Sequence, residues 1–409
     1  MLIVPVYTDG RNHSMTKRDM STVRAWVDVD LAALVANYDR LRERAKPRIG
    51  VLPVVKADAY GLGMCPVVRA LEDREPWGYG VASISEGVEL REKGIDRRTV
   101  CFFCTPGELE LAVEAGITPA IGDLAALQHY RSAAKQTGRR LPFHLEIDTG
   151  IGRCGFHHAE VERWLPEVLA ACKSDLEWEG TFAHYHSADE DDSGQTREQW
   201  ERFQQCRKAF PAGAGGVYHT AASVAAVRWP EYSADLLRPG LFLYGGLAGG
   251  EPVEPEAVVA VRARVTSVRD VPKGWTASYG ATYRAAQRSR WATLSIGYGD
   301  GLRRELSNNG FVLFGERLAP IIGRVCMDVT MVDVTALDGV EPGSVATLIG
   351  GPRNSPTSLI AVADRCGTIT YEILTGLTRR LPRCYDFGTL NQPASAKAGD
   401  QSGGDAFQK

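Results

Sequence analysis

The decisive stretch of this sequence is Val54-Val55-Lys56-Ala57-Asp58-Ala59-Tyr60-Gly61, in which an apolar strand ends on a lysine. A charged ammonium group does not suit a packed core, because lysine is almost never fully buried without a partner. In parallel barrels, active sites lie at the carboxyl ends of the strands. We therefore take Lys56 as a candidate functional residue at the end of a first barrel strand.

Eight short apolar segments follow one another between Val51 and Gly240, mostly separated by stretches with helical spacing. They lie near Val55, Val81, Cys101, Ala120, Leu145, Phe182, Val217 and Leu237. Eight such units predict a parallel (β/α)8 barrel of the TIM type, which we assign to residues 23–249. At its start, residues 26–30 alternate like a strand, and a helix is expected after Asp30 as its N-cap.

After Gly249 the sequence pattern changes from alternating strand and helix segments to mainly strand segments. Residues 250–390 are therefore predicted to form a mostly β second domain. Strands are expected at 258–271, 291–296, 311–314 and 330–334, with turn residues between them. A late helical piece is expected over residues 358–381. Residues 1–22 and 391–409 lack periodicity and are predicted to be disordered ends, with Met20 as an alternative start.

Bulk composition narrows the class of protein. A chain of 409 residues with a formal net charge of -3 gives no reason to expect nucleic acid or an anionic membrane as partner, so a small metabolite fits better. Nine scattered cysteines favour a reducing cytoplasm over a disulfide-stapled secreted domain. No apolar run approaches the ~20 residues that a membrane span requires, and no secretory leader is recognised.

The lysine stretch resembles the cofactor-lysine motif of alanine racemases, and more loosely that of the related barrel decarboxylases, whose lysine binds pyridoxal phosphate covalently. Further segments resemble the racemases in the family's own order and cover residues 26–385. The resemblance implies a pyridoxal-phosphate enzyme that interconverts L-alanine and D-alanine. In it, Lys56 would carry the cofactor and serve as one catalytic base.

Several barrel residues acquire cofactor roles from this resemblance. Arg153, in Asp148-Thr149-Gly150-Ile151-Gly152-Arg153-Cys154-Gly155-Phe156, would meet the phenolic oxygen of the cofactor and assist the substrate. His184 would stack on the pyridine ring, and Arg238 would face the pyridine nitrogen. A phosphate suits a helix start with free N–H groups. The expected phosphate-binding set is Tyr60, Ser223, Gly240, Leu241 and Tyr371.

Three segments of the second domain look like racemase signatures that the related decarboxylases lack. They are Ser278-Tyr279-Gly280, Ile296-Gly297-Tyr298-Gly299-Asp300-Gly301 and Gly323-Arg324-Val325-Cys326-Met327-Asp328. By the resemblance, Tyr279 is the second base, Tyr298 lines the entrance and the Met327 backbone helps to hold the substrate carboxylate. The family forms head-to-tail homodimers in which these residues reach the partner's barrel. Its cytoplasmic members supply D-alanine for peptidoglycan.

Racemisation explains why such residues are needed together. A proton must be removed from one face of the substrate and returned on the other, so two opposed bases are required. An ordinary tyrosine has a pKa near ~10, and lowering it by ~3 units needs roughly 4 kcal/mol, for which Arg153 is the candidate cation. An arginine facing the pyridine nitrogen stays charged, so the ring should remain unprotonated and side reactions should be curbed.

The sequence departs from the family pattern at three positions. Glu146 stands where a lysine, often carbamylated, is frequent, so we expect a permanent carboxylate to orient Arg153 and predict no carbamate. Ala222 replaces a common asparagine beside Ser223, and Leu62 replaces a histidine that often follows the Tyr-Gly pair. These departures concern the surroundings of the site and leave the reaction unchanged.

Other interpretations of the same residues remain open. Gly150-x-Gly152-x-x-Gly155 also matches a dinucleotide fingerprint, and the pair Cys101 and Cys104 matches half a zinc or redox site. His184 and His186 could form half a metal site, although no metal is expected. The enzymatic alternatives are a serine or broad-specificity racemase and a barrel decarboxylase. A non-catalytic pyridoxal-phosphate-binding protein is the alternative from another class.

Overall fold

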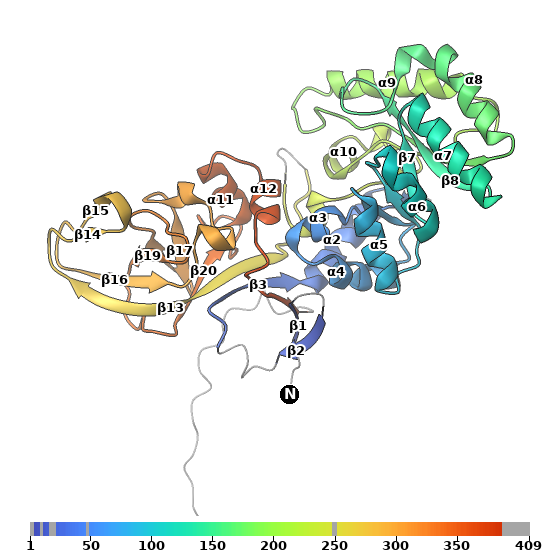
Figure 1. Ribbon diagram of the computed structural model, residues 1–409. Coiled ribbons are helices and arrows are strands. Elements are labelled where there is room, and N and C mark those ends of the chain that lie inside the picture. The colour runs from blue at the N-terminus through green and yellow to red at the C-terminus, as the bar shows by residue number, and fades with distance from the viewer. Residues whose placement is uncertain (1–3, 9–10, 16–21, 46–48, 248–251, 387–409) are drawn as a thin grey trace, which may run out of the picture.

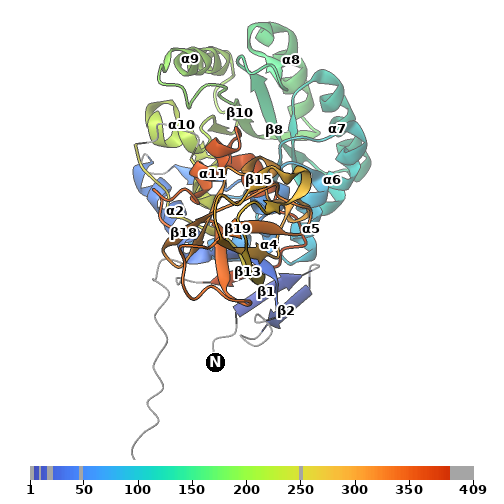
Figure 2. The same ribbon diagram turned by 90° about the vertical axis from the view of Figure 1, so that its left-hand side faces the viewer.

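The computed structural model describes residues 4–8, 11–15, 22–45, 49–247 and 252–386. Two bodies lie side by side: a barrel surrounded by helices, and a sheet-rich second domain (Figure 1). Turning the molecule places the second domain in front of the barrel (Figure 2). The predicted tail at 391–409 and both candidate start residues lie outside the described residues.

Eight parallel strands build the barrel and confirm the predicted segments. The carboxyl ends of the strands lead into the loops that carry the candidate site. The strands are β4 (Gly50–Val51), β5 (Tyr79–Val81), β6 (Thr99–Cys101), β7 (Thr118–Ile121), β8 (Leu141–Asp148), β10 (Leu176–Phe182), β11 (Val217–His219) and β12 (Leu236–Leu237). The ring closes where β12 pairs with β4, and it continues to β5 through a bridge between Val54 and Gly80.

Helices cover the outside of the barrel. They are α2 (Leu31–Arg44), α4 (Met64–Leu71), α5 (Ile84–Glu92), α6 (Leu109–Ala115), α7 (Leu124–Thr137), α8 (Val161–Cys172), α9 (Gly194–Lys208) and α10 (Ser223–Arg228). The short segment α3 (Lys56–Gly61) follows the first barrel strand and has left-handed backbone angles. The expected Asp30 cap is present, because its carboxylate accepts a hydrogen bond from Ala33 N at 2.9 Å. Side chains of β8 alternate: Phe143 and Leu145 pack in the cluster formed with the outer helices, whereas His144 and Glu146 form part of the polar barrel interior.

The second domain centres on a ten-stranded sheet. Its strands are β3 (Ala25–Asp30), β13 (Val259–Val271), β16 (Ser289–Leu294), β17 (Phe311–Phe314), β18 (Arg317–Pro320), β19 (Thr330–Asp333), β20 (Val345–Ile349) and β21 (Arg383–Asp386), joined by β1 (Val4–Thr8) and β2 (Arg11–Met15). A separate hairpin, β14 (Thr276–Ala277) and β15 (Tyr283–Arg284), lies at the end of the domain away from the barrel (Figure 1). The predicted late helical piece is two short helices, α11 (Leu359–Arg365) and α12 (Thr370–Thr375).

Two features of this sheet differ from the expected organisation. β3 pairs with β13 and β21, so the strand that the sequence assigns to the start of the barrel belongs to the second sheet. The sequence places residues 1–22 outside the fold, whereas β1 and β2 form a hairpin whose first strand pairs with β21. Strand pairing uses main-chain groups, so an exposed strand edge can recruit a segment that has no side-chain periodicity. In the described part of the chain, no helix is long and apolar enough to cross a bilayer.

Candidate active site

Lys56 begins an unusual turn at the carboxyl end of the first barrel strand. The next four residues, Ala57 to Tyr60, have φ between 52° and 57°, the left-handed region that side chains other than glycine disfavour. Hydrogen bonds hold the turn: Ala57 N donates to Glu86 Oε1 at 2.5 Å, and Met64 N donates to Asp58 Oδ1 at 2.7 Å. A strained segment held in this way is typical of functional sites.

The Lys56 amine lies in an environment that favours its neutral form. Burial lowers its pKa from the ordinary value, and the positive charge of Arg153 lowers it further, against a smaller opposing effect of Glu86. A neutral amine is the form that can attack a carbonyl group or accept a proton. The geometry therefore suits Lys56 for covalent attachment and for base chemistry.

Arg153 is paired with Glu146, as the sequence predicts. Arg153 Nη2 lies 3.5 Å from Glu146 Oε1, and its guanidinium lies 5.0 Å from the ring centroid of Phe103. Burial raises the pKa of Glu146, while the charges of Arg153 and Arg238 act in the opposite direction. A carboxylate supplied by the chain itself thus occupies the position beside Arg153.

The glycine-rich loop that carries Arg153 does not have the geometry of a dinucleotide site. A dinucleotide fingerprint leads from a strand directly into a helix. Here β8 leads into β9 (Phe156–His157), which pairs with β8 in parallel, and α8 begins only at Val161. The Asp148 carboxylate closes the loop by accepting hydrogen bonds from Gly150 N at 2.8 Å and Gly152 N at 3.1 Å.

Arg238 is buried at the centre of a polar network at the end of β12. Its Nη1 donates to His219 Nδ1 at 2.9 Å and to His219 O at 2.5 Å. Its Nη2 donates to Ala183 O at 2.8 Å and approaches His184 Nδ1 at 3.3 Å. Within the described part of the chain, the Nε–H of Arg238 makes no hydrogen bond, which leaves one directional donor for a ligand.

His184 is held neutral between these cations. Burial lowers its pKa well below the ordinary value, and the charges of Arg238, Arg153 and Lys56 lower it further in that order. The four side chains therefore sense one another electrostatically and form one site. Gln199, which the sequence analysis missed, holds the strand end: its Nε2 donates to His184 O at 3.0 Å, and its Oε1 accepts from His186 N at 3.0 Å.

The predicted phosphate-binding residues converge beside this network. Ser223 Oγ accepts hydrogen bonds from Gly240 N at 2.9 Å and Phe242 N at 3.3 Å. The ring of Tyr60 lies 5.9 Å from that of Tyr371, between ring centroids. A Cβ on Gly240 would lie 2.2 Å from the Tyr60 hydroxyl oxygen, so only glycine fits there.

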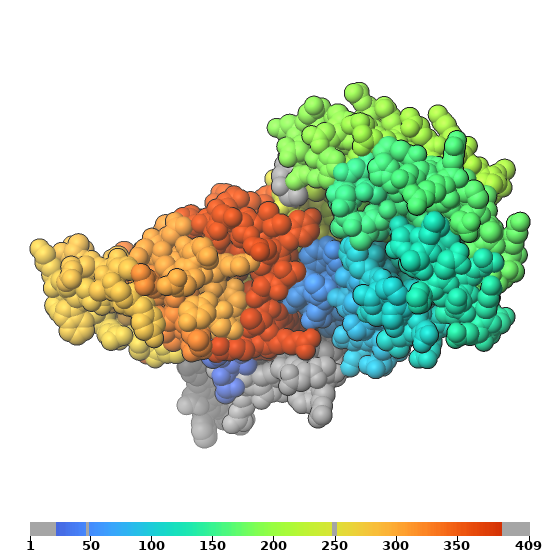
Figure 3. Space-filling view, turned by 45° about the horizontal axis from the view of Figure 1, so that its top comes forward, coloured from blue at the N-terminus to red at the C-terminus, as the bar shows by residue number. Residues whose placement is uncertain are grey.

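A cavity of about 520 Å³ adjoins these groups. Its walls include His184, Ala222, Ser223 and Tyr371. Helix α12, which carries Tyr371, lies where the red end of the described chain meets the barrel (Figure 3). Leu62, the other departure from the family pattern, is fully buried and its carbonyl accepts a hydrogen bond from the Tyr385 hydroxyl at 2.8 Å. Ala222 thus borders the cavity, whereas Leu62 belongs to the packing beneath the lysine turn.

Tyr279, Tyr298 and Met327 form a second group in the β domain. Tyr279 lies between β14 and β15 and is 71% exposed, and it lines a cavity of about 340 Å³ together with Met327. Tyr298 is fixed beside them, because its N–H donates to Cys326 O at 2.9 Å. The N–H of Met327 makes no hydrogen bond within the described residues, so it is available to an anionic ligand.

Ser278 sets the backbone that presents Tyr279. Its φ is 61°, in the left-handed region, and its Oγ donates to Arg324 O at 2.6 Å. Because β14 and β15 lie at the end of the domain away from the barrel (Figure 1), one chain does not bring Tyr279 to Lys56. The predicted site residues therefore fall into two separate groups within a single chain.

Asp300 supports the second group of site residues. The sequence analysis includes it in the motif 296–301 but gives it no role. It is completely buried, and its carboxylate pairs with Arg24 at 2.5 Å and with Arg380 at 3.3 Å. It also accepts a hydrogen bond from Gly297 N at 3.0 Å, which closes the turn that carries Tyr298. Its place between two glycines, Gly299 and Gly301, was the sequence signal that could have indicated a structural role.

The other candidate sites find little support in the geometry. No group of three or more His, Cys, Asp or Glu residues in the described ranges is arranged to hold a metal ion. Cys101 and Cys104 are free thiols, and Cys101 Sγ donates to Phe103 O at 3.4 Å. Cys101 belongs to the hydrophobic core, and Cys104 packs against it.

Comparison with known proteins identifies relatives over nearly the whole described chain. Two family models match: "Alanine racemase, N-terminal domain" over residues 29–248 and "Alanine racemase, C-terminal domain" over residues 258–385. The alanine racemase of Carboxydothermus hydrogenoformans is 37% identical over 367 residues, which are 88% of this chain and 99% of that protein. That of Citrifermentans bemidjiense is 38% identical over 374 residues, with coverages of 88% and 98%.

Solved structures show the same fold. Alanine racemase from the D-cycloserine producer Streptomyces lavendulae superposes with a TM-score of 0.85 at 33% identity, over 90% of this chain and 98% of that chain. Alanine racemase from Bartonella henselae with covalently bound pyridoxal phosphate superposes with a TM-score of 0.80 at 28% identity. That match covers 89% of this chain and 100% of the other.

Proposed function

The chain belongs to the alanine racemase family, and on this premise we propose that Lys56 and Tyr279 are the two bases with which it interconverts L-alanine and D-alanine. It is a pyridoxal-phosphate-dependent isomerase. Two observations carry the two-base assignment: a half-buried lysine held toward its neutral form in the barrel, and an exposed tyrosine on a strained turn in the β domain.

The residues at the barrel end fit pyridoxal phosphate. The Arg238 Nε–H that makes no hydrogen bond in the described chain suits the ring nitrogen, and the lowered pKa of the Lys56 amine suits covalent attachment. Arg153 would face the phenolic oxygen and His184 the ring. The phosphate would be held by Tyr60, Ser223, Gly240, Leu241 and Tyr371. When bound, the cofactor supplies an electron sink that acidifies the α-hydrogen of the amino acid.

The chain's own residues would then move the proton. Lys56 Nζ accepts the α-proton on one face of the substrate, and the Tyr279 hydroxyl donates a proton on the opposite face; the reverse reaction exchanges the roles. The Met327 N–H and Arg153 would hold the substrate carboxylate, and Tyr298 would restrict the entrance. Arg238 stays a charged donor, because a guanidinium does not give up its proton at neutral pH.

The two groups of site residues require a second copy of the chain. Tyr279 lies between β14 and β15, at the end of the β domain away from the barrel that carries Lys56 (Figure 1). A head-to-tail homodimer would bring each tyrosine to the partner's barrel and would cover the exposed Tyr279 and Met327 side chains. We place this dimer in the cytoplasm, where it would supply D-alanine for peptidoglycan.

The assignment is tested by isotope exchange. Purified protein with pyridoxal phosphate is incubated in heavy water with L-alanine or L-serine, and D-enantiomer formation and α-deuteration are followed. Wild type should form D-alanine rapidly, and both Lys56→Ala and Tyr279→Phe should abolish inversion. Inversion that survives in Tyr279→Phe would contradict the second base, and faster turnover of L-serine would change the assigned substrate.

A further inference from the structure

Four polar side chains form one chain of contacts through the barrel interior. His219 Nδ1 lies 2.9 Å from Arg238 Nη1, and His219 Nε2 lies 2.8 Å from His144 Nδ1. His144 Nε2 in turn lies 3.4 Å from Glu179 Oε2. Both imidazoles are completely buried. Buried polar groups are costly, and His144 Nε2 makes no hydrogen bond within the described residues, so this chain of contacts needs a reason.

The backbone is adapted to make room for this chain. The register of β10 against β8 shifts between Trp178 and Gly180, so Glu179 is the extra residue of a β-bulge. Bulges commonly re-aim a side chain. A Cβ on Gly180 would lie 2.5 Å from His144 Cε1, so the glycine beside the bulge is what admits the imidazole.

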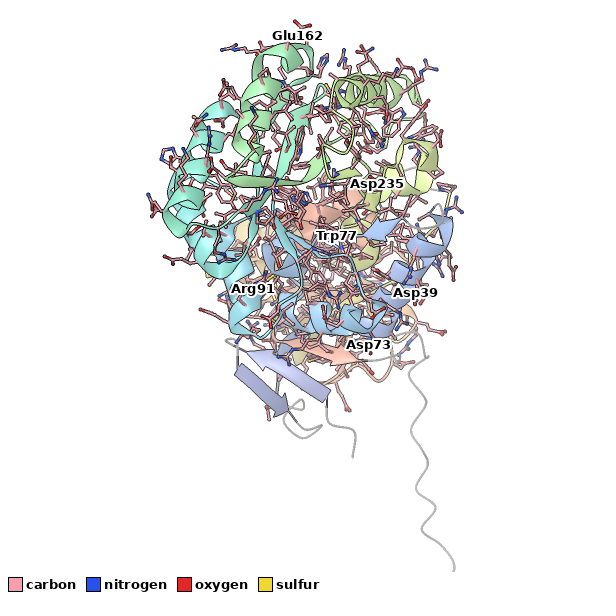
Figure 4. The ribbon with its side chains drawn as sticks, turned by 90° about the vertical axis from the view of Figure 1, so that its right-hand side faces the viewer. Asp39, Asp73, Trp77, Arg91, Glu162 and Asp235 are labelled. Atoms are coloured by element: carbon pink, nitrogen blue, oxygen red, sulfur yellow. The ribbon has the colours of Figure 1, made fainter. Side chains whose placement is uncertain are left out.

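This chain of contacts ends at the opposite end of the barrel from Lys56. Glu179 lies 3.5 Å from Arg98 Nε, just before β6 begins. Arg98 also lies 5.1 Å above the Trp77 ring, and the Trp77 ring lies 5.7 Å from that of His144. Figure 4 shows Trp77 near the middle of this end of the barrel. The Glu179 side chain is 20% exposed, so the chain reaches the solvent boundary there.

The donors and acceptors available fix the direction of the hydrogen bonds that run from Arg238 through His219 to His144. A guanidinium only donates, so His219 Nδ1 must accept and the proton of His219 must sit on Nε2. That Nε2–H donates to His144 Nδ1, which forces the proton of His144 onto Nε2 as well. The His144 Nε2–H lies 3.4 Å from the Glu179 carboxylate, an ion-pair distance at which it makes no hydrogen bond within the described residues. A second proton on either histidine would set two donors against each other.

We propose that His219, His144 and Glu179 are positioning residues that lock Arg238 in one orientation, leaving its Nε–H as the donor for the cofactor's ring nitrogen. The role of Arg238 in this statement rests on the proposed function. The direction of the hydrogen bonds does not, because it follows from the contacts alone. Burial lowers the pKa of both histidines, as a locked neutral state requires.

The first test observes the histidine protons directly. The holoenzyme is labelled with ¹⁵N-histidine, and His144 and His219 are assigned with His144→Gln and His219→Gln variants. Both should appear as neutral Nε2–H tautomers, with no titration between about pH 6 and pH 9, a range that includes the ordinary histidine pKa. A proton on Nδ1 of either ring, or a titration of either ring in this range, would overturn the proposal. This readout is independent of racemase activity.

The second test separates the acceptor from mere packing. Glu179→Gln keeps a polar oxygen facing His144 Nε2, whereas Glu179→Leu removes it. We expect Glu179→Leu to lower kcat about tenfold, the effect of some 1.4 kcal/mol, with little change in KM, and Glu179→Gln to stay within about threefold. Thr118→Val is the control, because Thr118 Oγ1 touches Glu179 at 3.4 Å but lies outside the directed chain.

Equal kcat in wild type and Glu179→Leu, with unchanged histidine signals, would refute the positioning role. If Glu179→Leu fails to fold, the tautomer measurement on wild type and Glu179→Gln still decides the matter. Should the chain prove not to racemise alanine at all, the ¹⁵N result would still stand or fall by itself.

Discussion

The Glu146 carboxylate lies 3.5 Å from the Arg153 guanidinium, and both are held at the carboxyl end of β8 and the loop that follows it. The resemblance implies a lysine, often modified to an anion, at this position, and an ordinary glutamate side chain supplies the anion here. Because Glu146 is buried and Arg153 is partly exposed, the carboxylate can steer the guanidinium while the guanidinium still reaches a ligand.

Glu146→Gln should therefore impair the enzyme without unfolding it. Loss of one charge-assisted contact, worth about 1.5–3 kcal/mol, should lower kcat/KM roughly ten- to a hundredfold. Racemisation rates of wild type should not depend on added bicarbonate, and intact mass should show no carbamate. The exposed Glu177→Gln serves as control and should keep full activity. A bicarbonate requirement in wild type would contradict the assigned role of Glu146.

The lowered pKa of Lys56 makes stability depend on pH in a defined direction. Between that lowered value and the ordinary 10.5, the unfolded chain binds a proton that the folded cofactor-free protein does not. Stability should therefore rise with pH across this window. Urea unfolding of cofactor-free wild type and Lys56→Met should show this slope in the wild type and a smaller one in the variant. If the free energy of unfolding depends on pH in the same way in both proteins, the pKa of Lys56 is not lowered by folding.

A shared active site predicts complementation between two inactive variants. Mixed dimers of Lys56→Ala and Tyr279→Phe chains would contain one intact site and one doubly altered site. Random mixing after co-expression should thus recover about a quarter of wild-type activity, since half of the dimers are mixed. Sites contained within one chain would recover none. Two copies of the Lys56→Ala chain, purified in the same way, provide the baseline.

Gly240→Ala should weaken cofactor binding selectively. The new Cβ would lie 2.2 Å from the Tyr60 hydroxyl oxygen, and overpacking of this kind costs about 1–3 kcal/mol. The dissociation constant for pyridoxal phosphate, followed by absorbance, should rise at least about fivefold. Gly107→Ala is a matched control, because its Cβ would meet nothing within 4 Å. If both variants bind pyridoxal phosphate with equal affinity, Gly240 is not part of the phosphate site.

Asp300→Ala should destabilise the second domain. It removes the buried partner that Arg24, Arg380 and the Gly297 N–H share. Both arginines are more than a third exposed, so the expected loss is about 1–3 kcal/mol, mainly from the buried Gly297 N–H that loses its acceptor. Denaturant unfolding of the holoenzyme measures the loss. Asp191, which is fully exposed and pairs with Arg228 at 3.3 Å, gives the contrast, since Asp191→Asn should change stability by less than about 1 kcal/mol.

The sequence predicted the barrel well because its signals are local. Each barrel strand is a short apolar run between helical stretches, and Lys56, Arg153 and Arg238 lie at strand ends where function is expected. In the second domain, β13, β16, β17 and β19 were predicted for the same reason. Strands β18, β20 and β21 and the short hairpin β14–β15 were missed, and β1 and β2 lie in a segment predicted to be disordered. The positions of β20 and β21 are set by pairing with the distant strands β13 and β3.

Long-range polar contacts were beyond prediction. Nothing in the local pattern pairs His144 with His219, which are 75 positions apart, or Asp300 with Arg24, which are 276 apart. The left-handed turn after Lys56 gave no warning either, because it contains alanine, aspartate and tyrosine where glycine would be the usual signal. The available hint was that His144 and Glu146 interrupt the apolar strand β8 on one face.

The position of β3 affects the order in which this protein can be made. The strand is among the first parts of the described chain to leave the ribosome, yet its antiparallel partner β13 begins only at Val259. At the usual 5–20 residues per second, β3 waits roughly 10–50 s for that partner. The barrel can close during this interval, whereas the second sheet cannot, so the nascent chain carries an unpaired strand ahead of a finished barrel.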